Sequence, residues 1–268
     1  MSSNPACFIG DIPRHYDRGL GPVIFEAYAE EIARRAAIWG PRNALEIAAG
    51  TGIVTRKLRD ALPADARLTA TDLNAPMLEI ARDKFRTDER VSFDVADALV
   101  LPFADGAFDA VICQFGLMFF PDKDAAHREA ARVLKPHGRY LTSVWDAPRY
   151  NPFARLGQEM VERFFPGDPP KFVSPFSCPE IDPTKEALIA AGFTNIVISV
   201  LPRVHEIADV KAFATGLVFG HPLLNQIRAR GEVAPEAIVE ALAERLSEEF
   251  GAPARMPMQA ILFEASRL

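Results

Sequence analysis

Cysteine is scarce in this chain of 268 residues. The three cysteines, Cys7, Cys113 and Cys178, lie far apart and form no C-x-x-C pair. A zinc site or a disulfide framework is normally encoded by several cysteines at short, regular spacings. The sequence therefore predicts neither a bound metal nor disulfide bonds, and it favours a reducing, cytoplasmic location.

Long apolar runs and clusters of basic residues are also missing. The longest apolar run, 111–120, is about half as long as a membrane-spanning helix requires, and the N-terminus lacks the basic start and apolar stretch of a secretory signal. The formal net charge is -6 at pH 7, whereas affinity for phosphate backbones comes from clustered Lys and Arg. We therefore expect no stable membrane insertion and no nucleic-acid partner, and the oligomeric state stays open.

The composition is that of a globular protein, with 49% hydrophobic and 25% charged residues and a mean hydropathy of +0.03. Along the first 145 residues, short apolar runs alternate with amphipathic stretches, which is typical of a parallel sheet covered by helices on both faces. The pattern predicts strands over 44–48, 68–71, 91–95, 108–113 and 139–144. It predicts helices over 22–39, 54–62, 76–85 and 125–134.

Helix start and stop signals agree with this pattern. Asn74 provides a capping side chain just before Pro76, and the P-H-G turn at 136–138 ends the helix before it. Beyond residue 145, a stretch rich in Pro and Phe indicates a packed loop region with one or two helices. Farther along, we expect a helix over 183–191, strands over 196–204 and 258–265, and a largely helical segment over 209–250.

A turn with two glycines follows the first predicted strand. Residues 45–55 read L-E-I-A-A-G-T-G-I-V-T, with Gly50 and Gly52 just before a helix. Glycines let the backbone approach a ligand closely, and a helix N-terminus offers free N–H groups. A dinucleotide site would have a third small residue where Thr55 stands. On this segment alone, a ligand site and a tight turn without a ligand both stay open.

The next three strands also end in polar or small residues. Asp72 follows Gly52 by 20 residues and closes the second strand, where an acidic side chain can accept hydrogen bonds from both hydroxyls of a ribose. Asp97 and Ala98 follow the third strand, and Gln114 begins the segment after the fourth. Ligands of open α/β sheets bind at the carboxyl ends of the strands. The four strand ends together favour a ligand site.

These motifs together resemble the class I S-adenosylmethionine-dependent methyltransferases. The resemblance covers about 16–144 and rests on E-I-A-A-G-T-G at 46–52 for the usual E-x-G-x-G-x-G, on Asp72, on V-A-D-A at 95–98 and on L-K-P-H-G-R-Y at 134–140. Within the family, the chain is most similar to the small-molecule group that includes the quinone-biosynthesis methyltransferases.

The resemblance implies a fold and a cofactor. The fold is α/β, with a Rossmann-like, seven-stranded, mostly parallel sheet of order 3-2-1-4-5-7-6 whose last strand is antiparallel, helices on both faces and a helical lid. The cofactor is S-adenosyl-L-methionine, which leaves S-adenosyl-L-homocysteine as product. The residues implied to bind it are Tyr16, Glu46, Ala48, Gly50, Gly52, Asp72, Leu73, Met77, Asp97, Ala98, Gln114 and Phe115.

The same resemblance gives these residues separate roles. The glycine turn, in which Ala48 replaces the first family glycine, would wrap the methionine part of the cofactor. Asp72 would accept from the ribose hydroxyls, and Asp97 would accept from the adenine amino group. Gln114 and Phe115 would lie under the methionine part, close to the reactive methyl group.

The length beyond a minimal sheet of this kind is expected to form a lid within a single domain, 1–268. We expect an N-terminal helical segment at 1–40, a cofactor-binding core at 41–145, and a terminal helix and β-hairpin at 181–207 and 258–268. The lid or substrate segments are expected at 146–180 and 208–257.

The methyl acceptor is expected to be a small organic molecule, methylated at O, N or C by in-line displacement. The segment after the fourth strand lacks the Pro-Pro-aromatic pattern of enzymes that methylate DNA bases, and the Phe-rich lid favours an apolar or aromatic acceptor. A sulfonium donor is already activated, so a dedicated base is not obligatory and the catalytic residues stay unknown. Candidates for a base are His15, Asp146 and His221, and candidates for aromatic contact with the sulfonium are Phe115, Phe119 and Trp145.

Two alternatives stay open from the sequence. The first is an NAD-dependent oxidoreductase on a Rossmann-like sheet, against which Thr55 and the antiparallel terminal strands both count. The second is a non-catalytic protein that keeps the cofactor pocket, against which the undegraded cofactor motifs count.

Overall fold

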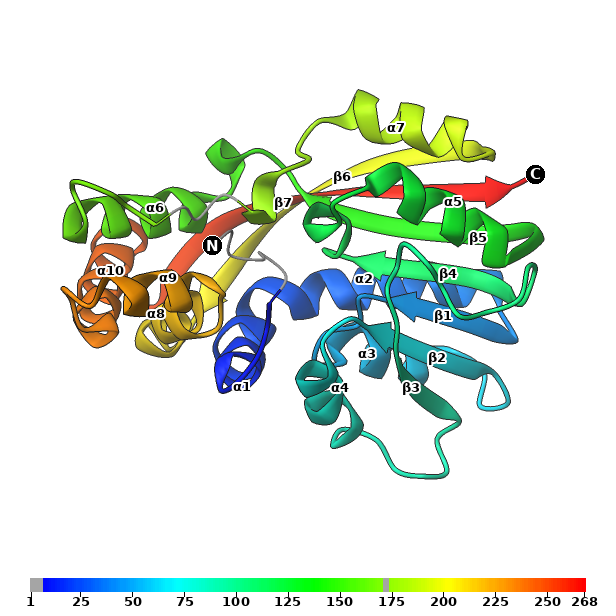
Figure 1. Cartoon of the computed structure of the whole chain (residues 1–268), viewed down its shortest axis with the longest axis horizontal. Helices are drawn as coiled ribbons and strands as arrows, with labels where there is room; N and C mark the ends of the chain where they lie inside the picture. Colours follow the sequence, from blue (N-terminus) through cyan, green and yellow to red (C-terminus); the bar gives the residue numbers. More distant parts are fainter. Residues whose placement is uncertain (1–6, 171–173) are drawn as a thin grey trace.

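A seven-stranded sheet runs through the computed structural model of the chain, which describes residues 7–170 and 174–268 (Figure 1). Its order is β3-β2-β1-β4-β5-β7-β6, and β7 pairs antiparallel with both of its neighbours while the other neighbouring pairs are parallel. The predicted fold class is therefore confirmed. The strands are β1 (Asn43–Ile47), β2 (Arg67–Asp72), β3 (Val91–Val95), β4 (Phe108–Gln114), β5 (Leu134–Trp145), β6 (Phe193–Ile207) and β7 (Ala254–Arg267).

Helices account for most of the remaining chain. The α-helices are α1 (Ile12–His15), α2 (Glu26–Trp39), α3 (Ile53–Ala61), α4 (Ala75–Arg82), α5 (Lys123–Val133), α6 (Pro152–Phe164), α7 (Ile181–Ala190), α8 (Val210–Phe219), α9 (Leu223–Arg230) and α10 (Pro235–Phe250). A π-helix, η1 (Tyr16–Phe25), and the short 3-10 turns η2 (Leu117–Phe119), η3 (Pro148–Tyr150) and η4 (Ser174–Phe176) complete the list. Within the described ranges, no helix has both the length and the apolar character needed to cross a membrane.

Alternate side chains of β4 explain the three-layer arrangement. Ala110 and Ile112 are fully buried in a cluster with side chains from α2 and α3, whereas Val111 and Cys113 are fully buried in a cluster with side chains from α5 and α7. Successive side chains of a strand point to opposite faces of its sheet. A strand that is apolar on both faces therefore requires helices on both sides, which are drawn in Figure 1.

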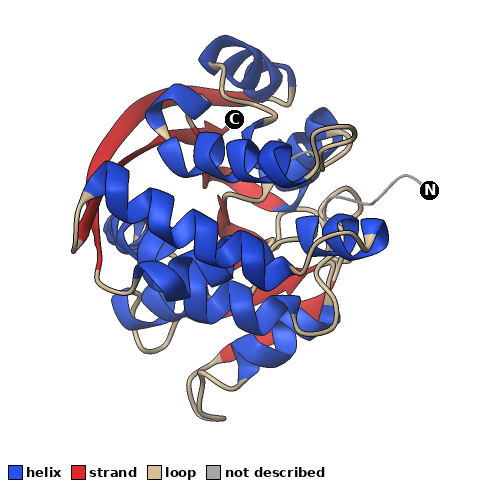
Figure 2. Ribbon diagram, turned by 90° about the vertical axis from the view of Figure 1, so that its left-hand side faces the viewer, coloured by secondary structure: helices blue, strands red, loops and turns tan. Residues whose placement is uncertain are grey.

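The last two strands are much longer than the predicted 196–204 and 258–265. They pair from Phe193 with Arg267 to Ile207 with Ala254, so the hairpin extends well beyond the end of β5. The helices α6, α8, α9 and α10 gather around this extension, at the left of Figure 1 and toward the viewer in Figure 2. Alternate residues of the extension, Ala254, Met256 and Met258, are buried in one cluster with side chains of these helices, and this burial is why the strands continue.

The N-terminal helix also differs from its prediction. The residues predicted as one helix over 22–39 belong to two elements, because η1 contains Pro22 and α2 begins only at Glu26. A π-helix is rare and is often found at functional sites. The helix predicted to end before the turn at 136–138 does end at Val133, but that turn lies inside β5, where the pairing with β4 shifts.

Glycines bring η1 into close contact with α8. A Cβ added to Gly19 would lie 2.6 Å from Cα of Gly216, and one added to Gly220 would lie 2.6 Å from the backbone N of Tyr16. Both distances are too short for real carbon atoms, so the two helices approach at backbone contact. This contact joins the N-terminal segment to the helices around the hairpin extension.

We expect Gly19→Ala to destabilise the protein by about 1–3 kcal/mol, because the added methyl group would have to push η1 away from α8. Urea unfolding monitored by circular dichroism measures this change. Gly167→Ala is the matched control, since no atom of the described residues lies within 4 Å of its Cβ position, and its free energy of unfolding should stay within about 0.5 kcal/mol of wild type. Equal effects of the two substitutions would contradict the packing argument.

Candidate functional site

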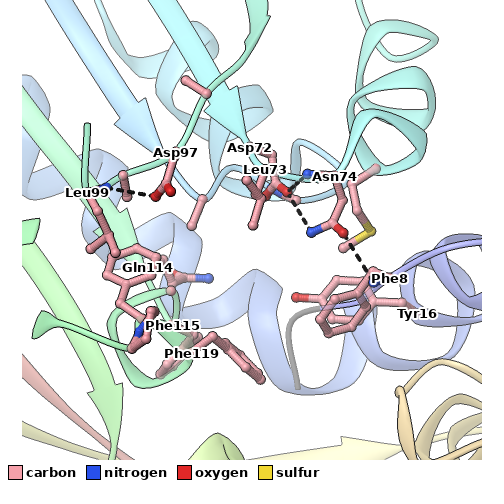
Figure 3. Close-up of a pocket in the computed structure, with 18 residues that line it drawn as sticks. Phe8, Tyr16, Asp72, Leu73, Asn74, Asp97, Leu99, Gln114, Phe115 and Phe119 are labelled. Carbon is pink, nitrogen blue, oxygen red and sulfur yellow. Dashed lines mark hydrogen bonds between the residues drawn. The ribbon is translucent and has the colours of Figure 1, made fainter. Parts of the chain in front are cut away.

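A cavity of about 200 Å³ opens at the carboxyl ends of β1, β2 and β4, and Figure 3 shows it in close-up. This is the edge at which open α/β sheets bind ligands. Ten of the twelve residues predicted to bind the cofactor line this cavity. They are Tyr16, Ala48, Gly50, Asp72, Leu73, Met77, Asp97, Ala98, Gln114 and Phe115.

The glycine turn after β1 owes its shape to left-handed backbone conformations. Gly50 and Gly52 have φ values of 56° and 79°, and Ala48, which has a Cβ, also adopts φ 54°. Phe115, at the end of β4, adopts φ 52°. For a residue with a side chain this conformation costs about 1–2 kcal/mol, and such strain concentrates at ligand sites. The two strained residues both line the cavity.

Asp72 holds the glycine turn in place. Its Oδ2 accepts a hydrogen bond from the backbone N–H of Gly50 at 2.9 Å, and its Oδ1 accepts one from the backbone N–H of Asn74 at 2.8 Å. Burial raises the pKa of the Asp72 carboxyl above its ordinary value, while these N–H groups act in the opposite direction. The carboxylate thus ties the end of β2 to the turn after β1.

Two polar side chains enter the cavity on the side opposite Asp97. Figure 3 shows the Tyr16 hydroxyl and the Gln114 amide approaching each other across the open space. The Gln114 Nε2 donates to the Phe25 carbonyl at 3.4 Å, whereas its Oε1 is buried with no hydrogen-bond partner among the described residues. A buried acceptor of this kind is costly unless a ligand supplies the donor.

The charged side chains that line the larger cavity are all acidic. Asp72 and Asp97 are its acidic residues, and the described residues around the cavity include no Lys or Arg. Such a lining suits a ligand with a net positive charge.

Two predicted binding residues lie outside the cavity lining. Glu46 is fully buried behind the glycine turn, and Gly52 packs its Cα side against Ala81, where an added Cβ would come within 2.8 Å of the Ala81 Cβ. Burial raises the pKa of Glu46 to about 8; Thr55 opposes part of this shift, and the Asp72 charge adds a smaller upward contribution. Both residues are therefore in position to shape the turn from behind.

A second, smaller cavity of about 40 Å³ adjoins the first. The two share Phe8, Tyr16, Phe115 and Phe119 in their walls. The remaining lining of the smaller cavity is Leu20, Ile24, Phe25, Met118, Trp145, Phe153, Pro175, Leu217 and His221. In its wall, Phe115 and Trp145 stack with ring centroids 4.0 Å apart. The smaller cavity is therefore apolar and strongly aromatic.

Of the three candidate bases, the structure brings only His221 to a cavity wall. Its Nδ1 accepts from the Leu223 N–H at 3.1 Å, and burial lowers its pKa to about 4. The ring is thus neutral near pH 7, with its proton on Nε2. The His15 ring packs on Phe219, and the Asp146 carboxylate accepts from Ala147 N and Gln259 Nε2.

The sequence reasoning missed seven residues that line the larger cavity, which are Phe8, Asn74, Ala96, Leu99, Gly116, Phe120 and Pro121. Asn74 stands where a helix cap was predicted, but its side chain makes no capping bond to α4. Its amide instead bonds to Asp72 and to the backbone of Phe8. The D-L-N sequence at 72–74 places an amide beside the acidic residue and could have suggested this contact. Phe8 had no comparable signal.

Comparisons with known proteins agree with this geometry. A model of the methyltransferase domain matches residues 45–142. The demethylmenaquinone methyltransferase of Thermus thermophilus is 36% identical over 168 residues, which cover 58% of this chain and 75% of that protein. The ubiquinone/menaquinone biosynthesis C-methyltransferase UbiE of Haemophilus ducreyi is 36% identical over 118 residues, 43% of this chain and slightly under half, 46%, of that protein.

Solved structures show the same fold at lower identity. The YcgJ protein of Bacillus subtilis has a TM-score of 0.59 at 19% identity, and the match covers 90% of this chain and 98% of that one. Phosphoethanolamine N-methyltransferase 2 of Haemonchus contortus, solved with S-adenosylhomocysteine, has a TM-score of 0.59 at 17% identity and covers 95% of this chain and 56% of that one.

The sheet order and the cavity at its carboxyl edge define a protein of the class I methyltransferase fold. With the sequence matches, the chain belongs to the S-adenosylmethionine-dependent methyltransferase family, and S-adenosylmethionine is its cofactor. The cavity fits this cofactor, because its lining is acidic and holds a buried acceptor, Gln114 Oε1, whereas the cofactor is cationic and contains donors. The oxidoreductase alternative is set aside.

We expect Asp72→Ala to weaken binding of S-adenosylhomocysteine by about 1–3 kcal/mol, because the donors at this site would lose a charged acceptor. Isothermal titration calorimetry measures the change in Kd. Asp94→Ala is the matched control, since Asp94 is exposed on β3 and outside the cavity lining. Unchanged affinity in the Asp72 variant would rule out a ligand role for this carboxylate.

Glu46 predicts a pH dependence of stability. Its pKa is about 8 in the folded chain against an ordinary 4.5, so the folded chain keeps a proton that the unfolded chain releases. The free energy of unfolding should therefore fall as pH rises from about 5 to about 8. Glu46→Gln mimics the protonated form and should become more stable than wild type, progressively, over this range.

Denaturant unfolding at several pH values measures the difference between Glu46→Gln and wild type. The control is Glu232→Gln, because Glu232 is exposed and its neutralisation should give a difference that is flat with pH. A flat difference for Glu46→Gln as well would show that this carboxyl ionises as it does in water.

Proposed function

We propose that this methyltransferase methylates an electron-rich aromatic ring of the quinol type, at a ring carbon. The observation that carries this proposal is the small apolar cavity that adjoins the cofactor cavity and shares four aromatic side chains with it. An acceptor held there would face the methionine end of the cofactor site. An apolar, aromatic wall selects a flat apolar ring and excludes a hydrated, charged acceptor.

The relatives support the same acceptor class. The names of the Thermus thermophilus and Haemophilus ducreyi relatives refer to demethylmenaquinone and to ubiquinone or menaquinone biosynthesis. The segment shared with the Haemophilus ducreyi protein is 46% of its length, so it leaves the rest of that protein unmatched. The acceptor proposal therefore rests on the cavity first and on these names second.

We assign the cofactor parts as follows. Asp72 accepts from the ribose hydroxyls, Leu73 and Met77 pack on the adenine, and the Asp97 carboxylate lies at the adenine end. The backbone around Gly50 wraps the methionine part, which ends near Gln114, Phe115 and Tyr16. The location of all these groups around one cavity supports the assignment, as does the acidic lining.

The side chains then provide alignment and exclusion of water. When bound, S-adenosylmethionine would supply an electrophilic methyl group to a ring carbon and leave as S-adenosylhomocysteine, and the proton of that ring carbon would pass to solvent once the product leaves the enclosed site. Phe115 and Trp145 form a flat aromatic wall beside this position, which favours a cation and an aromatic ring alike. His221 lines the smaller cavity, and because burial lowers its pKa to about 4 we assign it no role in removing a proton.

The proposal predicts turnover of a reduced 1,4-dihydroxynaphthalene with a short apolar ring substituent. We expect S-adenosylhomocysteine to accumulate and the product to carry one new carbon-bound methyl group, measured by mass spectrometry and NMR. Phosphoethanolamine, which is charged and hydrated, is the control acceptor and should give no product. Methylation of phosphoethanolamine but not of the naphthol would overturn the proposed acceptor class.

A variant that fills the smaller cavity tests the location of the acceptor. Leu217 lies on α8 and lines this cavity but not the larger one. We expect Leu217→Phe to lower kcat/KM for the naphthol by roughly tenfold or more, since small changes in pocket volume give changes of this size. The Kd of S-adenosylhomocysteine should stay unchanged. A parallel loss of both would show that the two cavities are not separate subsites.

A further inference from the structure

The side chain of Asn74 links the cofactor cavity to the N-terminal segment. Its Nδ2 donates to Asp72 Oδ1 at 3.2 Å, and its Oδ1 accepts from the backbone N–H of Phe8 at 3.3 Å. Figure 3 shows these bonds in line along one wall of the cavity. A cap of α4 would need neither bond, because a capping side chain accepts from the N–H groups of its own helix.

Phe8, at the end of this series of hydrogen bonds, lies at the junction of the two cavities. Its ring lies in the walls of both. It contacts the rings of Tyr16, Phe119 and His221 edge-on, with centroids 5.7, 6.0 and 6.4 Å away. The residues 7–11, which we call the N-terminal strap, are thus held to the sheet edge by an amide and to the acceptor cavity by a ring.

When a ribose binds, the hydrogen-bond donors around the Asp72 carboxylate outnumber its acceptor positions. A carboxylate offers about four lone-pair positions, and three N–H donors already use it, from Gly50 N, Asn74 N and Asn74 Nδ2. Two ribose hydroxyls need two positions, so one donor has to change partner. The Asn74 Nδ2 bond is the longest of the three and the only one that a side-chain rotation can release.

We propose that Asn74 is a positioning residue that transmits cofactor binding to the N-terminal strap. This inference rests on the proposed placement of the ribose at Asp72. The ribose hydroxyls take the place of Asn74 Nδ2 on the carboxylate, and the released amide donates to a ribose oxygen while its Oδ1 keeps the Phe8 N–H. Cofactor, Asn74 and strap then form one hydrogen-bonded chain, and Phe8 is held at the junction more firmly when cofactor is bound.

A second tie keeps the rest of the N-terminal segment in place. Lys84, just beyond α4, forms an ion pair with Asp17 of η1. Because this pair does not involve Asn74, loss of the Asn74 amide should release the strap without releasing η1. The effect of cofactor should therefore be local to the strap.

Hydrogen exchange of peptides that contain Phe8 tests the proposal. In wild type, saturating S-adenosylhomocysteine should slow exchange of the Phe8 amide by about three- to tenfold, as expected for one strengthened hydrogen bond. In Asn74→Ser the slowing should be less than about twofold, although calorimetry still detects binding. Serine is a preferred helix cap, so this variant keeps the start of α4 while it is too short to reach Phe8.

Asn43→Ser is the matched control. This variant also loses a side-chain amide hydrogen bond, from Asn43 Nδ2 to the Ala107 carbonyl, but Asn43 lies at the opposite edge of the sheet. In this variant the Phe8 amide should respond to S-adenosylhomocysteine as it does in wild type. Asn74→Ala provides a second test of the same bond should the serine variant be unstable, with the same expected loss of the response.

Three results would overturn the proposal. Wild-type slowing in the Asn74 variants would show that the strap responds by another route. Bound S-adenosylhomocysteine without slowing in wild type would show that the strap does not respond. Absence of binding to wild type would remove the proposed cofactor placement, and this inference with it, so failure of the proposed function is distinguished from failure of the linkage.

Discussion

The carboxylate of Asp72 is the interaction around which the site is built. It gathers N–H groups from the turn after β1 and from the residues after β2, and these segments are neighbours because β1 and β2 pair in parallel register. The left-handed residues of the turn are tolerated because this carboxylate and the packing of Gly52 on Ala81 fix the backbone from two sides. A buried carboxylate in an acidic cavity is costly in the absence of a cation, and binding of a cation offsets that cost.

Aromatic residues divide the space beyond this acidic edge. Phe8 and Tyr16 come from the N-terminal segment, Phe115 and Phe119 from the end of β4 and its turn, and all four face both cavities. A charged ligand and an apolar ligand can therefore both contact these four side chains. The backbone contact between η1 and α8, made through Gly19 and Gly216, fixes the position of the N-terminal segment, which contributes two of these four side chains.

The sequence predicted the parts of the site that depend on local pattern. Strand ends, the glycine turn and the acidic residue at a fixed offset follow from periodicity and spacing, so Asp72 and Gln114 were placed correctly at one edge. Phe8 could not be predicted, since its position depends on a bond to Asn74 across 66 residues. The π-helix and the long hairpin were missed for a similar reason: packing against α8 decides the first and packing beneath α6, α8, α9 and α10 decides the second, and neither leaves a periodic signal.

The hairpin extension has a mechanical consequence. From Val197 to Ile207, β6 stays paired with β7, and this hairpin carries the chain from the sheet to the helices α6, α8, α9 and α10. Bending this two-stranded hairpin would break several of the hydrogen bonds between β6 and β7 at once. Ligands are therefore expected to enter and leave the smaller cavity through local openings at its rim. The helices α6, α8, α9 and α10 are expected to move together with the sheet.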